Sequence, residues 1–387
     1  GQYFFSRPFG SNELARMTSE RFYSGAWRPC SPESAKDFSA IAYYFGREVQ
    51  RELDVPVGII HLAVGGSPTE AWIRRAALAG DPELRAMAQG NWLTNAALDD
   101  WCRERGHQNL DAGIKFGLPV PGDDLGPNHH FKPGFLWSAG PARLLPFAIR
   151  GVIWYQGESN ASRAYQYRDL FPLMISNWRS EWGQGDFPFY WVQLADFKAE
   201  KAEPGESDWA ELRESQTMTL RLPNTGQAVI IDLGEGRDIH PRNKYDVASR
   251  LVRWALVKDY GLKFPYRSPE YKSLAVAGNK ATVTIDCFGS SLRTFDVDEP
   301  RGFAVCGADR VWHWATGKVV APNRVELSSP KVEAPVAVRY AWADNPVCNL
   351  FSADGLPVTP FRTDDFAMIT KRSEEHTSEL QSRQCIS

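Results

Sequence analysis

The stretch GVIWYQGESN, residues 151–160, places an apolar run directly before a polar loop. The apolar run, 149–155, is short and rich in β-branched and aromatic residues, which is typical of a strand buried in a parallel sheet. Similar apolar runs occupy 57–64, 190–194 and 228–233. We therefore expect four buried strands, and the strand at 149–155 leads straight into a group of polar side chains.

Helical patterns alternate with these strands. Apolar residues recur at spacings of three and four over 38–53, four apart over 163–182, and again over 244–260. This alternation indicates a parallel sheet with helices on both faces, here an α/β domain that spans residues 1–261. Between 86 and 146 no clear period is present, so we expect an irregular insertion there.

The pattern changes after residue 262, where short alternating segments are separated by Gly, Pro and Asn. This pattern predicts a β-sandwich-like domain over 262–371. Its tryptophans Trp312, Trp314 and Trp342 fit a core position and a sugar-binding platform equally well. With 387 residues and 43% hydrophobic content, the chain is long enough for both units.

Composition excludes several classes of function. The formal net charge is −3 and the basic residues are scattered, so no nucleic-acid partner is expected. No run approaches the roughly 18 apolar residues that a membrane span requires. The six cysteines form no CxxC pair, and His129 and His130 lack a third ligand at a fixed spacing. We therefore expect neither a metal site nor a cofactor.

Both ends of the chain are unusual. It begins at Gly1 without an initiator Met, and no signal peptide is visible, so we expect that the natural start is missing. Residues 372–387 are polar and unpatterned, and they look like translated sequencing-adapter read-through. We expect this tail to be non-native and to carry no evolved function.

Three polar motifs each follow a predicted strand, and strand ends are where open α/β sheets bind ligands. The first motif is GGSPTEAW at residues 65–72. Gly65 and Gly66 let backbone N–H groups approach a developing oxyanion. The alternative is that this glycine pair only forms a tight turn.

The second motif is WYQGESN at residues 154–160. An amide side chain at Gln156 beside the flexible Gly157 suits an oxyanion hole. Glu158 is expected to hold the loop by hydrogen bonds. General acid–base catalysis and helix capping are the alternatives for Glu158. Asn160 closes the motif.

The third motif is DLGEGRDIHP at residues 232–241. Residues two apart in an extended segment point the same way, so Asp238 can lie beside the imidazole of His240. There it would fix the tautomer of the ring and stabilise its charged form. A lone histidine is more often structural, but an Asp neighbour at a strand end favours a catalytic histidine.

These residues and their order resemble the sialate O-acetylesterase family of SGNH-type carbohydrate esterases. The likeness covers nearly all of 27–365, and supporting text lies at 30–40, 151–160, 209–214 and 340–346. The resemblance implies a flavodoxin-like SGNH core with an added β domain. It also implies a metal-free serine esterase that removes acetyl groups from sialic acids or related glycans, in a periplasmic or secreted location.

The resemblance also assigns the acid and the base. The catalytic histidine falls on His240 and its acid on Asp238. Many SGNH hydrolases place the acid three residues before the histidine, a position held here by Arg237. Asp232 and Glu235 are therefore the alternatives to Asp238.

The resemblance puts the oxyanion donors on the Gly65-Gly66 turn and on the loop from Gln156 to Asn160, with Gln156 first because it leaves the strand directly. The nucleophile of the family sits in a Gly-Gln-Ser-Asn segment upstream, whereas Gly1-Gln2 is followed here by Tyr3. We therefore expect that the nucleophile is missing and that the chain as given is nearly inactive. The alternative nucleophiles within the chain are Ser11, Ser67 and Ser159.

An acetylated carbohydrate is thus the expected binding partner. Two other functions stay open on the sequence. One is an acetylxylan esterase of the same superfamily, which differs only in its sugar. The other is a glycan-binding protein without catalysis, which would lack the serine in its natural form as well.

Overall fold

The computed structural model describes residues 6–371, and the predicted non-native tail at 372–387 lies outside them. The α-helices are α1 (Ser11–Ala15), α2 (Pro32–Ala35), α3 (Ala40–Leu53), α4 (Arg75–Gly80), α5 (Asp100–Lys115), α6 (Phe135–Ala139), α7 (Pro141–Leu144), α8 (Ala164–Trp182), α9 (Asp208–Met218) and α10 (Lys244–Lys258). Short 3₁₀ helices are η1 (Thr69–Trp72), η2 (Arg85–Ala88), η3 (Glu158–Arg163) and η4 (Thr219–Arg221). No helix of the described part is long and apolar enough to cross a membrane.

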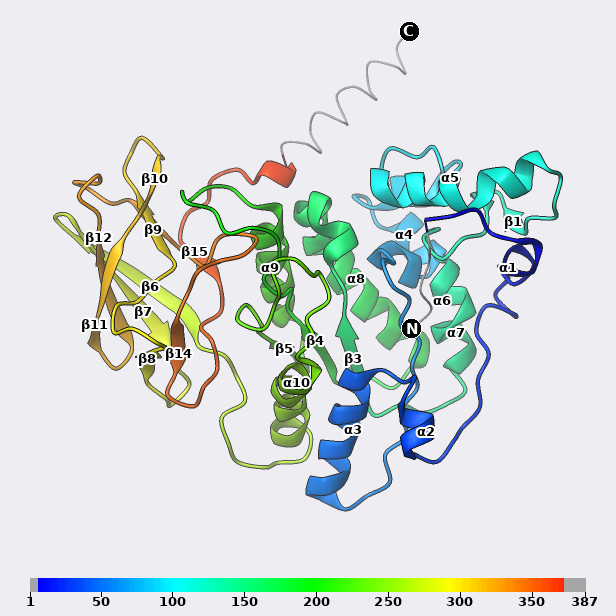
Figure 1. Cartoon of the computed structure of the whole chain (residues 1–387), viewed down its shortest axis with the longest axis horizontal. Helices are drawn as coiled ribbons and strands as arrows, with labels where there is room; N and C mark the ends of the chain where they lie inside the picture. The colour runs from blue at the N-terminus through cyan, green and yellow to red at the C-terminus, as the bar shows by residue number, and fades with distance from the viewer. Residues whose placement is uncertain (1–5, 372–387) are drawn as a thin grey trace, which may run out of the picture.

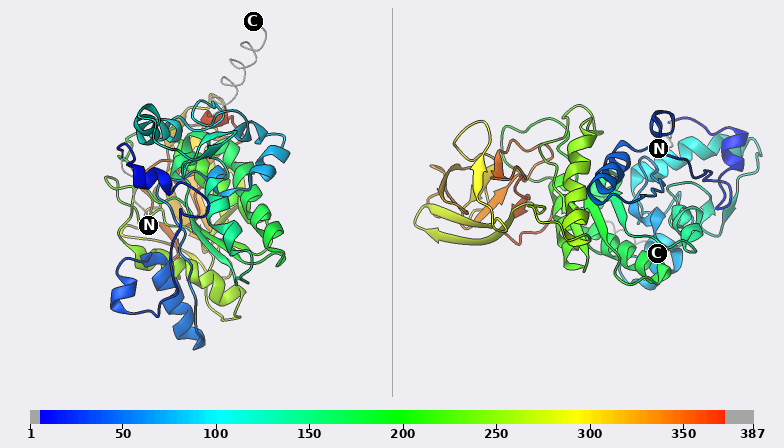
Figure 2. Two further views of the ribbon diagram at one scale, coloured as in Figure 1. Left: turned by 90° about the vertical axis from the view of Figure 1, so that its right-hand side faces the viewer. Right: turned by 90° about the horizontal axis from the view of Figure 1, so that it is seen from below.

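The strands fall into two groups that lie side by side along the long axis of the molecule (Figures 1 and 2). The first group is β1 (Gly122–Asp123), β2 (Gly126–Pro127), β3 (Val152–Tyr155), β4 (Phe189–Val192) and β5 (Thr225–Ala228). The second group is β6 (Glu270–Ala277), β7 (Lys280–Asp286), β8 (Leu292–Thr294), β9 (Phe303–Cys306), β10 (Trp312–Trp314), β11 (Thr316–Ala321), β12 (Arg324–Ser328), β13 (Ala337–Tyr340), β14 (Leu350–Ser352) and β15 (Phe361–Arg362).

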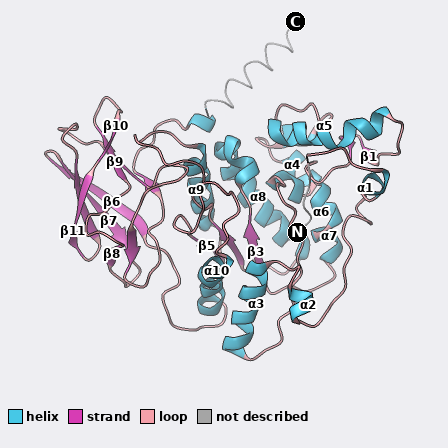
Figure 3. Ribbon diagram, in the orientation of Figure 1, coloured by secondary structure: helices cyan, strands magenta, loops and turns pink. Residues whose placement is uncertain are grey.

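A small parallel sheet, with the strand order β3-β4-β5, lies among the helices (Figure 3). Val152 pairs with Phe189, and Phe189 pairs with Thr225. The strands predicted at 149–155 and 190–194 are confirmed as β3 and β4. The polar QGESN loop therefore leaves the carboxyl end of a real strand.

Two predicted strands differ from the structure. The run at 57–64 forms no named strand, and Val57 and Ile60 are 37% and 40% exposed, so burial does not hold this segment against a neighbour. Strand β5 ends at Ala228, where the predicted strand 228–233 begins. The apolar residues just after Ala228 are buried but are not part of strand β5. The apolar run therefore covers the segment that follows the strand.

Helices cover both faces of the parallel sheet because side chains alternate along β4. Trp191 contacts Phe171 of α8 on one face, with 5.1 Å between ring centroids. Tyr190 contacts Trp254 of α10 on the other face, and α3 packs on α10. A Cβ at Gly226 would lie 2.3 Å from the Trp254 ring, so glycine lets that indole lie against β5.

The segment 86–146 is more regular than its sequence indicates, since it contains the 16-residue helix α5. The buried face of α5 consists largely of small or polar residues, so no apolar period marks it: Cys102, Gly106, Asn109, Leu110 and Gly113. Gly106 lies under Trp92, where a Cβ would be 2.3 Å from the ring. Close helix packing replaces large apolar side chains here.

The expected change to β structure after residue 262 is confirmed. Strands β10-β9-β13-β15 form one antiparallel sheet and β11-β12-β7-β6 another. Val283 and Val325 of the second sheet share a core with Phe303, Val305 and Tyr340 of the first. Arg339, which alternates with Tyr340 on β13, pairs at 3.1 Å with Glu206 of the segment before α9.

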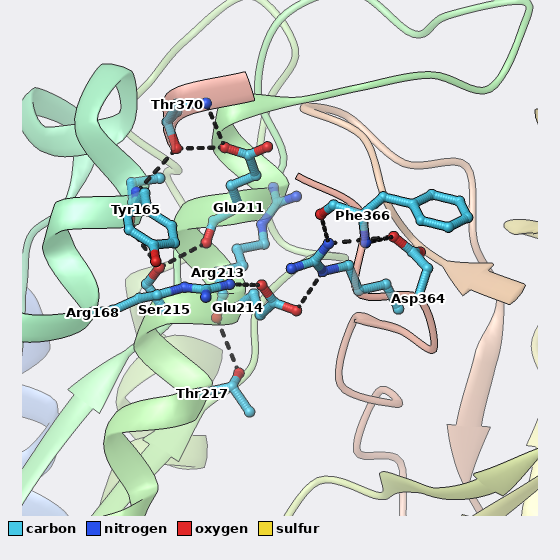
Figure 4. Close-up of polar contacts among 12 residues, drawn as sticks. Tyr165, Arg168, Glu211, Arg213, Glu214, Ser215, Thr217, Asp364, Phe366 and Thr370 are labelled. Carbon is cyan, nitrogen blue, oxygen red and sulfur yellow. Dashed lines mark hydrogen bonds and ion pairs between the residues drawn. The ribbon is translucent and has the colours of Figure 1, made fainter. Parts of the chain in front are cut away.

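Helix α9 joins the helical part to the β strands through buried polar contacts (Figure 4). Arg213 is fully buried and donates to backbone carbonyl groups on both sides of the junction, at 2.6–2.9 Å. Glu214 accepts from Arg362 at 2.8 Å, and Glu211 accepts from the hydroxyl of Thr370 at 2.6 Å. Breaking this junction would leave several buried charges without partners, so the two parts are held firmly together.

Candidate active site

The turn at 65–72 and the loop at 156–163 are joined by a buried hydrogen-bond network. Gln156 stands at its centre and is 8% exposed. Its Nε2 donates to the Ser67 carbonyl at 3.2 Å and to Asn160 Oδ1 at 2.7 Å. Its Oε1 accepts from the hydroxyls of Thr69 at 2.6 Å and Tyr167 at 3.1 Å.

This network bears on the predicted role of Gln156 as the first oxyanion donor. Both amide hydrogens already have acceptors inside the protein. An amide in this state fixes the position of the 65–72 turn and has no N–H left for a substrate oxygen. The geometry therefore favours a positioning role for Gln156.

Hydrogen bonds hold the side chain of Asn160, which is 1% exposed. Asn160 Oδ1 accepts from the Thr69 backbone N–H at 3.0 Å, and Nδ2 donates to Glu70 Oε2 at 3.0 Å. Glu70 is also buried and pairs with Arg163 at 2.7 Å. Because the Asn160 amide and the Glu70 carboxylate are both bonded inside the protein, this half of the site is rigid.

Glycines shape the loop and the turn that meet here. Gly157 has φ +151°, and a Cβ there would lie 2.7 Å from Leu212. Gly66 has φ +70°, and a Cβ there would lie 2.9 Å from the Trp101 ring. Gly65 and Gly66 are exposed, so their backbone is accessible to a ligand. These features fit the predicted oxyanion turn.

Two of the three serines considered as nucleophiles donate their hydroxyl groups to backbone carbonyl groups. The Ser67 hydroxyl is buried, donates to the Val64 carbonyl at 2.8 Å and accepts from Trp72. The Ser159 hydroxyl donates to the Gly66 carbonyl at 2.8 Å. Ser11 begins the short helix α1. Within residues 6–371 no serine hydroxyl bonds to the His240 ring.

The histidine loop is much more open than the other two segments. The His240 side chain is 79% exposed, and its Nδ1 lies 3.7 Å from Asp238 Oδ1. That separation exceeds a normal hydrogen bond of about 3.2 Å. Asp238 instead accepts from the backbone N–H of His240 at 2.9 Å, which stabilises the local turn. Asp238 and His240 are therefore adjacent, but their side chains are not hydrogen-bonded to each other.

The alternative acids are held by other partners. Asp232 forms a two-pronged ion pair with Arg250, at 2.5 and 2.6 Å. Glu235 accepts from the Arg242 backbone N–H at 3.0 Å. Asp238 is therefore the carboxylate with the closest connection to His240 among the three.

Glu158 lies in the loop after β3, near His240 and Lys244. Burial raises the pKa of its carboxyl group, and its own backbone N–H, the nearby His240 ring, the Gly157 N–H and Lys244 oppose that rise. Burial also lowers the pKa of Lys244, which Glu158, Asp238 and Glu235 oppose. Glu158 therefore lies near the histidine loop, and its loop-supporting role stays a prediction.

Two residues of this region were missed by the sequence reasoning. Asp196 follows β4, and its Oδ1 accepts from the Gly234 backbone N–H at 2.6 Å, which anchors the histidine loop. The same search for polar residues after a strand would have found Asp196. Lys244 begins α10, four residues after His240, and no motif marks it.

His129 and His130, which we did not expect to bind a metal, are buried in the core. His129 is fully buried, its Nε2 contacts Asn109 Oδ1 at 3.0 Å, and its Nδ1 accepts from the Phe131 backbone N–H at 3.0 Å. Across residues 6–371 no group of three or more His, Cys, Asp or Glu side chains is placed to hold a metal ion.

Comparison with known proteins relates the chain to carbohydrate esterases. A family model described as carbohydrate esterase, sialic acid-specific acetylesterase, matches residues 139–247. A solved structure of a carbohydrate acetylesterase from Xanthomonas citri is 36% identical, with a TM-score of 0.72, and the match covers 95% of this chain and 72% of that one.

Curated relatives give the same result. Sialate O-acetylesterase of Homo sapiens is 28% identical over 374 residues, a match that covers 89% of this chain and 64% of the relative. Sialate O-acetylesterase of Mus musculus is 29% identical over 353 residues, covering 84% of this chain and 63% of the relative. The chain therefore spans a little under two thirds of the length of these relatives.

The parallel sheet flanked by helices and the match to the acetylesterase structure relate the chain to the α/β class of carbohydrate esterases. The chain belongs to the sialate O-acetylesterase family of carbohydrate esterases.

Proposed function

We propose that the protein is a carbohydrate O-acetylesterase with an SGNH-type, flavodoxin-like core, which hydrolyses acetyl esters of sialic acid or related glycans. The proposal rests on one observation above all. The segment that carries the exposed Gly65-Gly66 turn is held to the loop after β3 by hydrogen bonds: Gln156 donates to the Ser67 carbonyl, Ser159 donates to the Gly66 carbonyl, and Asn160 accepts from the Thr69 N–H. Glu158, in the same loop, lies near His240.

In the proposed mechanism a serine hydroxyl attacks the acetyl carbonyl carbon, and His240 accepts the hydroxyl proton as the new C–O bond forms. The carbonyl π electrons move onto oxygen, and backbone N–H groups of Gly65 and Gly66 donate to that oxyanion. Collapse of the intermediate releases the sugar hydroxyl, which takes the proton from His240. Water repeats the sequence on the acetyl-serine and releases acetate.

The supporting roles follow from the contacts. Gln156 and Asn160 keep the Gly65-Gly66 turn in place, and Asp238 aligns and stabilises the charged form of the His240 ring once its side chain closes the 3.7 Å separation. Asp196 anchors the backbone of the histidine loop at Gly234.

The nucleophilic serine in this proposal lies outside residues 6–371. Two observations support this part. The hydroxyls of Ser67 and Ser159 are bound to backbone carbonyl groups, and Ser67 is only 4% exposed. A fluorophosphonate probe followed by peptide mass spectrometry tests it. No serine of residues 6–371 should be labelled, and stoichiometric labelling of Ser11, Ser67 or Ser159 would overturn this part alone.

Acetate release tests the activity itself. A protein that carries the proposed serine should release acetate from O-acetylated sialic acids, and its His240→Ala variant should not. Release from acetylated xylan alone would replace sialic acid by xylan as the substrate. Binding of glycans with no acetate release from either substrate would favour the glycan-binding function and overturn the esterase proposal.

A further inference from the structure

A second candidate site lies at the junction between the two parts of the molecule, and none of the candidate active-site residues lines it. A shallow pocket there is lined on one side by Trp312, Trp314 and Trp342, and on another by the loop at 204–205. Its enclosed space has room for about one water molecule, so any larger ligand would lie across its mouth.

The pairing of the strands explains this pocket. Trp312 and Trp314 are two residues apart on β10, so both side chains lie on the same face of the sheet. Trp314 pairs with Ala304 on β9, and Ala304 pairs with Arg339 on β13. A small alanine between two large side chains leaves a hollow in the row, and the 204–205 loop borders it.

The rim of the pocket is aromatic and held in position. Trp314 is 41% exposed, yet its Nε1 donates to the Ala202 carbonyl at 2.7 Å. An exposed indole that is already fixed loses little conformational freedom when a ligand stacks on it. Large exposed aromatic rings held rigidly in this way are typical of binding surfaces.

The floor of the pocket is polar and has no excess charge. The guanidinium of Arg339 lies 4.2 Å from the Trp312 ring centroid and 5.1 Å from that of Trp342. Asp364 and Glu206 both pair with Arg339, so its positive charge is compensated. The buried indole N–H of Trp342 has no hydrogen-bond partner among the described residues. The pocket therefore offers hydrogen-bonding groups and aromatic faces without selecting an anion.

We propose that this pocket, formed by Trp312, Trp314 and Trp342 at the junction, binds an uncharged pyranose unit of a glycan. The C–H face of a pyranose ring stacks on an indole, and its hydroxyl groups bond to polar groups beside the ring. The compensated charge of Arg339 disfavours a sugar acid as the ligand of this pocket. The choice of a sugar ligand rests on the proposed function, but none of the candidate catalytic residues lines this pocket.

Binding measurements test this proposal without relying on catalysis. The His240→Ala variant, measured against a panel of neutral oligosaccharides and free N-acetylneuraminic acid, should bind at least one neutral oligosaccharide. In that background Trp314→Ala should weaken binding about tenfold or more, and Trp314→Phe should weaken it less because an aromatic face remains. The matched control is Trp27→Ala, which removes a tryptophan that is 64% exposed elsewhere and should leave binding unchanged.

The outcomes separate the two proposals. Equal binding by the parent variant and Trp314→Ala, or binding of the sugar acid only, would overturn the pocket. Absence of binding to every neutral oligosaccharide would overturn it as well. Trp314-dependent binding by a protein that releases no acetate from any ester would support the pocket while the proposed esterase activity fails. Thermal unfolding of Trp314→Ala and Trp314→Phe shows whether a loss of binding reflects a loss of fold.

Discussion

Two loops follow the two outer strands, β3 and β5, of the same parallel sheet, and they are held very differently. The loop after β3 places Gln156 and Asn160 in a buried network in which the amide groups of both residues are bonded. The loop after β5 leaves His240 79% exposed, and Asp238 bonds only to the backbone of this residue. One half of the candidate site is preorganised, and the other half has to be aligned when a ligand or nucleophile is in place.

This difference gives the two halves separate experimental signatures. Changes in the exposed loop should alter activity and leave stability intact. Changes in the buried loop should lower stability, and activity should fall as a result of that loss.

The largest expected effect concerns the exposed loop. In a protein that carries the proposed serine, His240→Ala should lower kcat/KM for ester hydrolysis by about 10⁴-fold, because no base remains to accept the serine proton. The melting temperature should not change, since the side chain is mostly exposed. The neighbouring Arg237→Ala is the control and should retain activity. Near-normal turnover by His240→Ala would remove this residue from the mechanism.

The next effect concerns the buried half. Glu70→Gln breaks a buried ion pair with Arg163 and should lower the free energy of unfolding by about 3–5 kcal/mol. Chemical denaturation measures this loss. The control is Glu52→Gln, which alters the exposed pair with Arg51 and should have no effect. If Glu70→Gln is as stable as Glu52→Gln, the loop after β3 is not the rigid half of the site.

Gln156→Ala separates positioning from direct catalysis. Removing the amide leaves the hydroxyls of Thr69 and Tyr167 without their acceptor, so the free energy of unfolding should fall by about 1–3 kcal/mol, together with kcat. A direct oxyanion donor would instead lower kcat with no change in stability. Denaturation and steady-state kinetics on one preparation distinguish these results, and the second pattern would return Gln156 to the predicted donor role.

A smaller effect should be seen with pH in the histidine pair at 129–130. Burial lowers the pKa of His129 to about 3, whereas the unfolded chain keeps the ordinary value near 6.5. Below pH 6.5 the unfolded state therefore binds protons that the folded state does not, and stability is lost as pH falls towards 3. The loss from this one group between pH 7.5 and pH 5 should be about 2 kcal/mol.

His129→Asn tests that assignment. The variant should be less stable at pH 7.5, but its stability should change less between pH 7.5 and pH 5 than that of the parent protein. An unchanged pH dependence would show that acid destabilisation originates in other groups.

The sequence predicted those parts of the fold where periodicity is strong. Strands β3 and β4 and helices α8 and α10 were found because their apolar residues recur at the spacing of one buried face. Helix α5 was missed because Gly106 and Gly113 form part of its buried face, and close packing leaves no apolar stripe.

The candidate site was predictable in its motifs but not in its contacts. Each motif could be found because polar residues follow an apolar run. The partners of Gln156 could not, since Thr69 lies 87 positions away in sequence and only the folded chain brings them together. The exposure of His240 could not be predicted from the sequence either, because it depends on which elements pack around the loop.

The most direct test of the proposed site is a structure of a fluorophosphonate adduct of a protein that carries the proposed serine. The tetrahedral phosphorus mimics the intermediate of acyl transfer. We predict that its oxygen accepts from the backbone N–H groups of Gly65 and Gly66, with the His240 ring within about 3 Å of the serine oxygen. An adduct on a serine of residues 6–371, or one remote from the Gly65-Gly66 turn, would contradict this assignment.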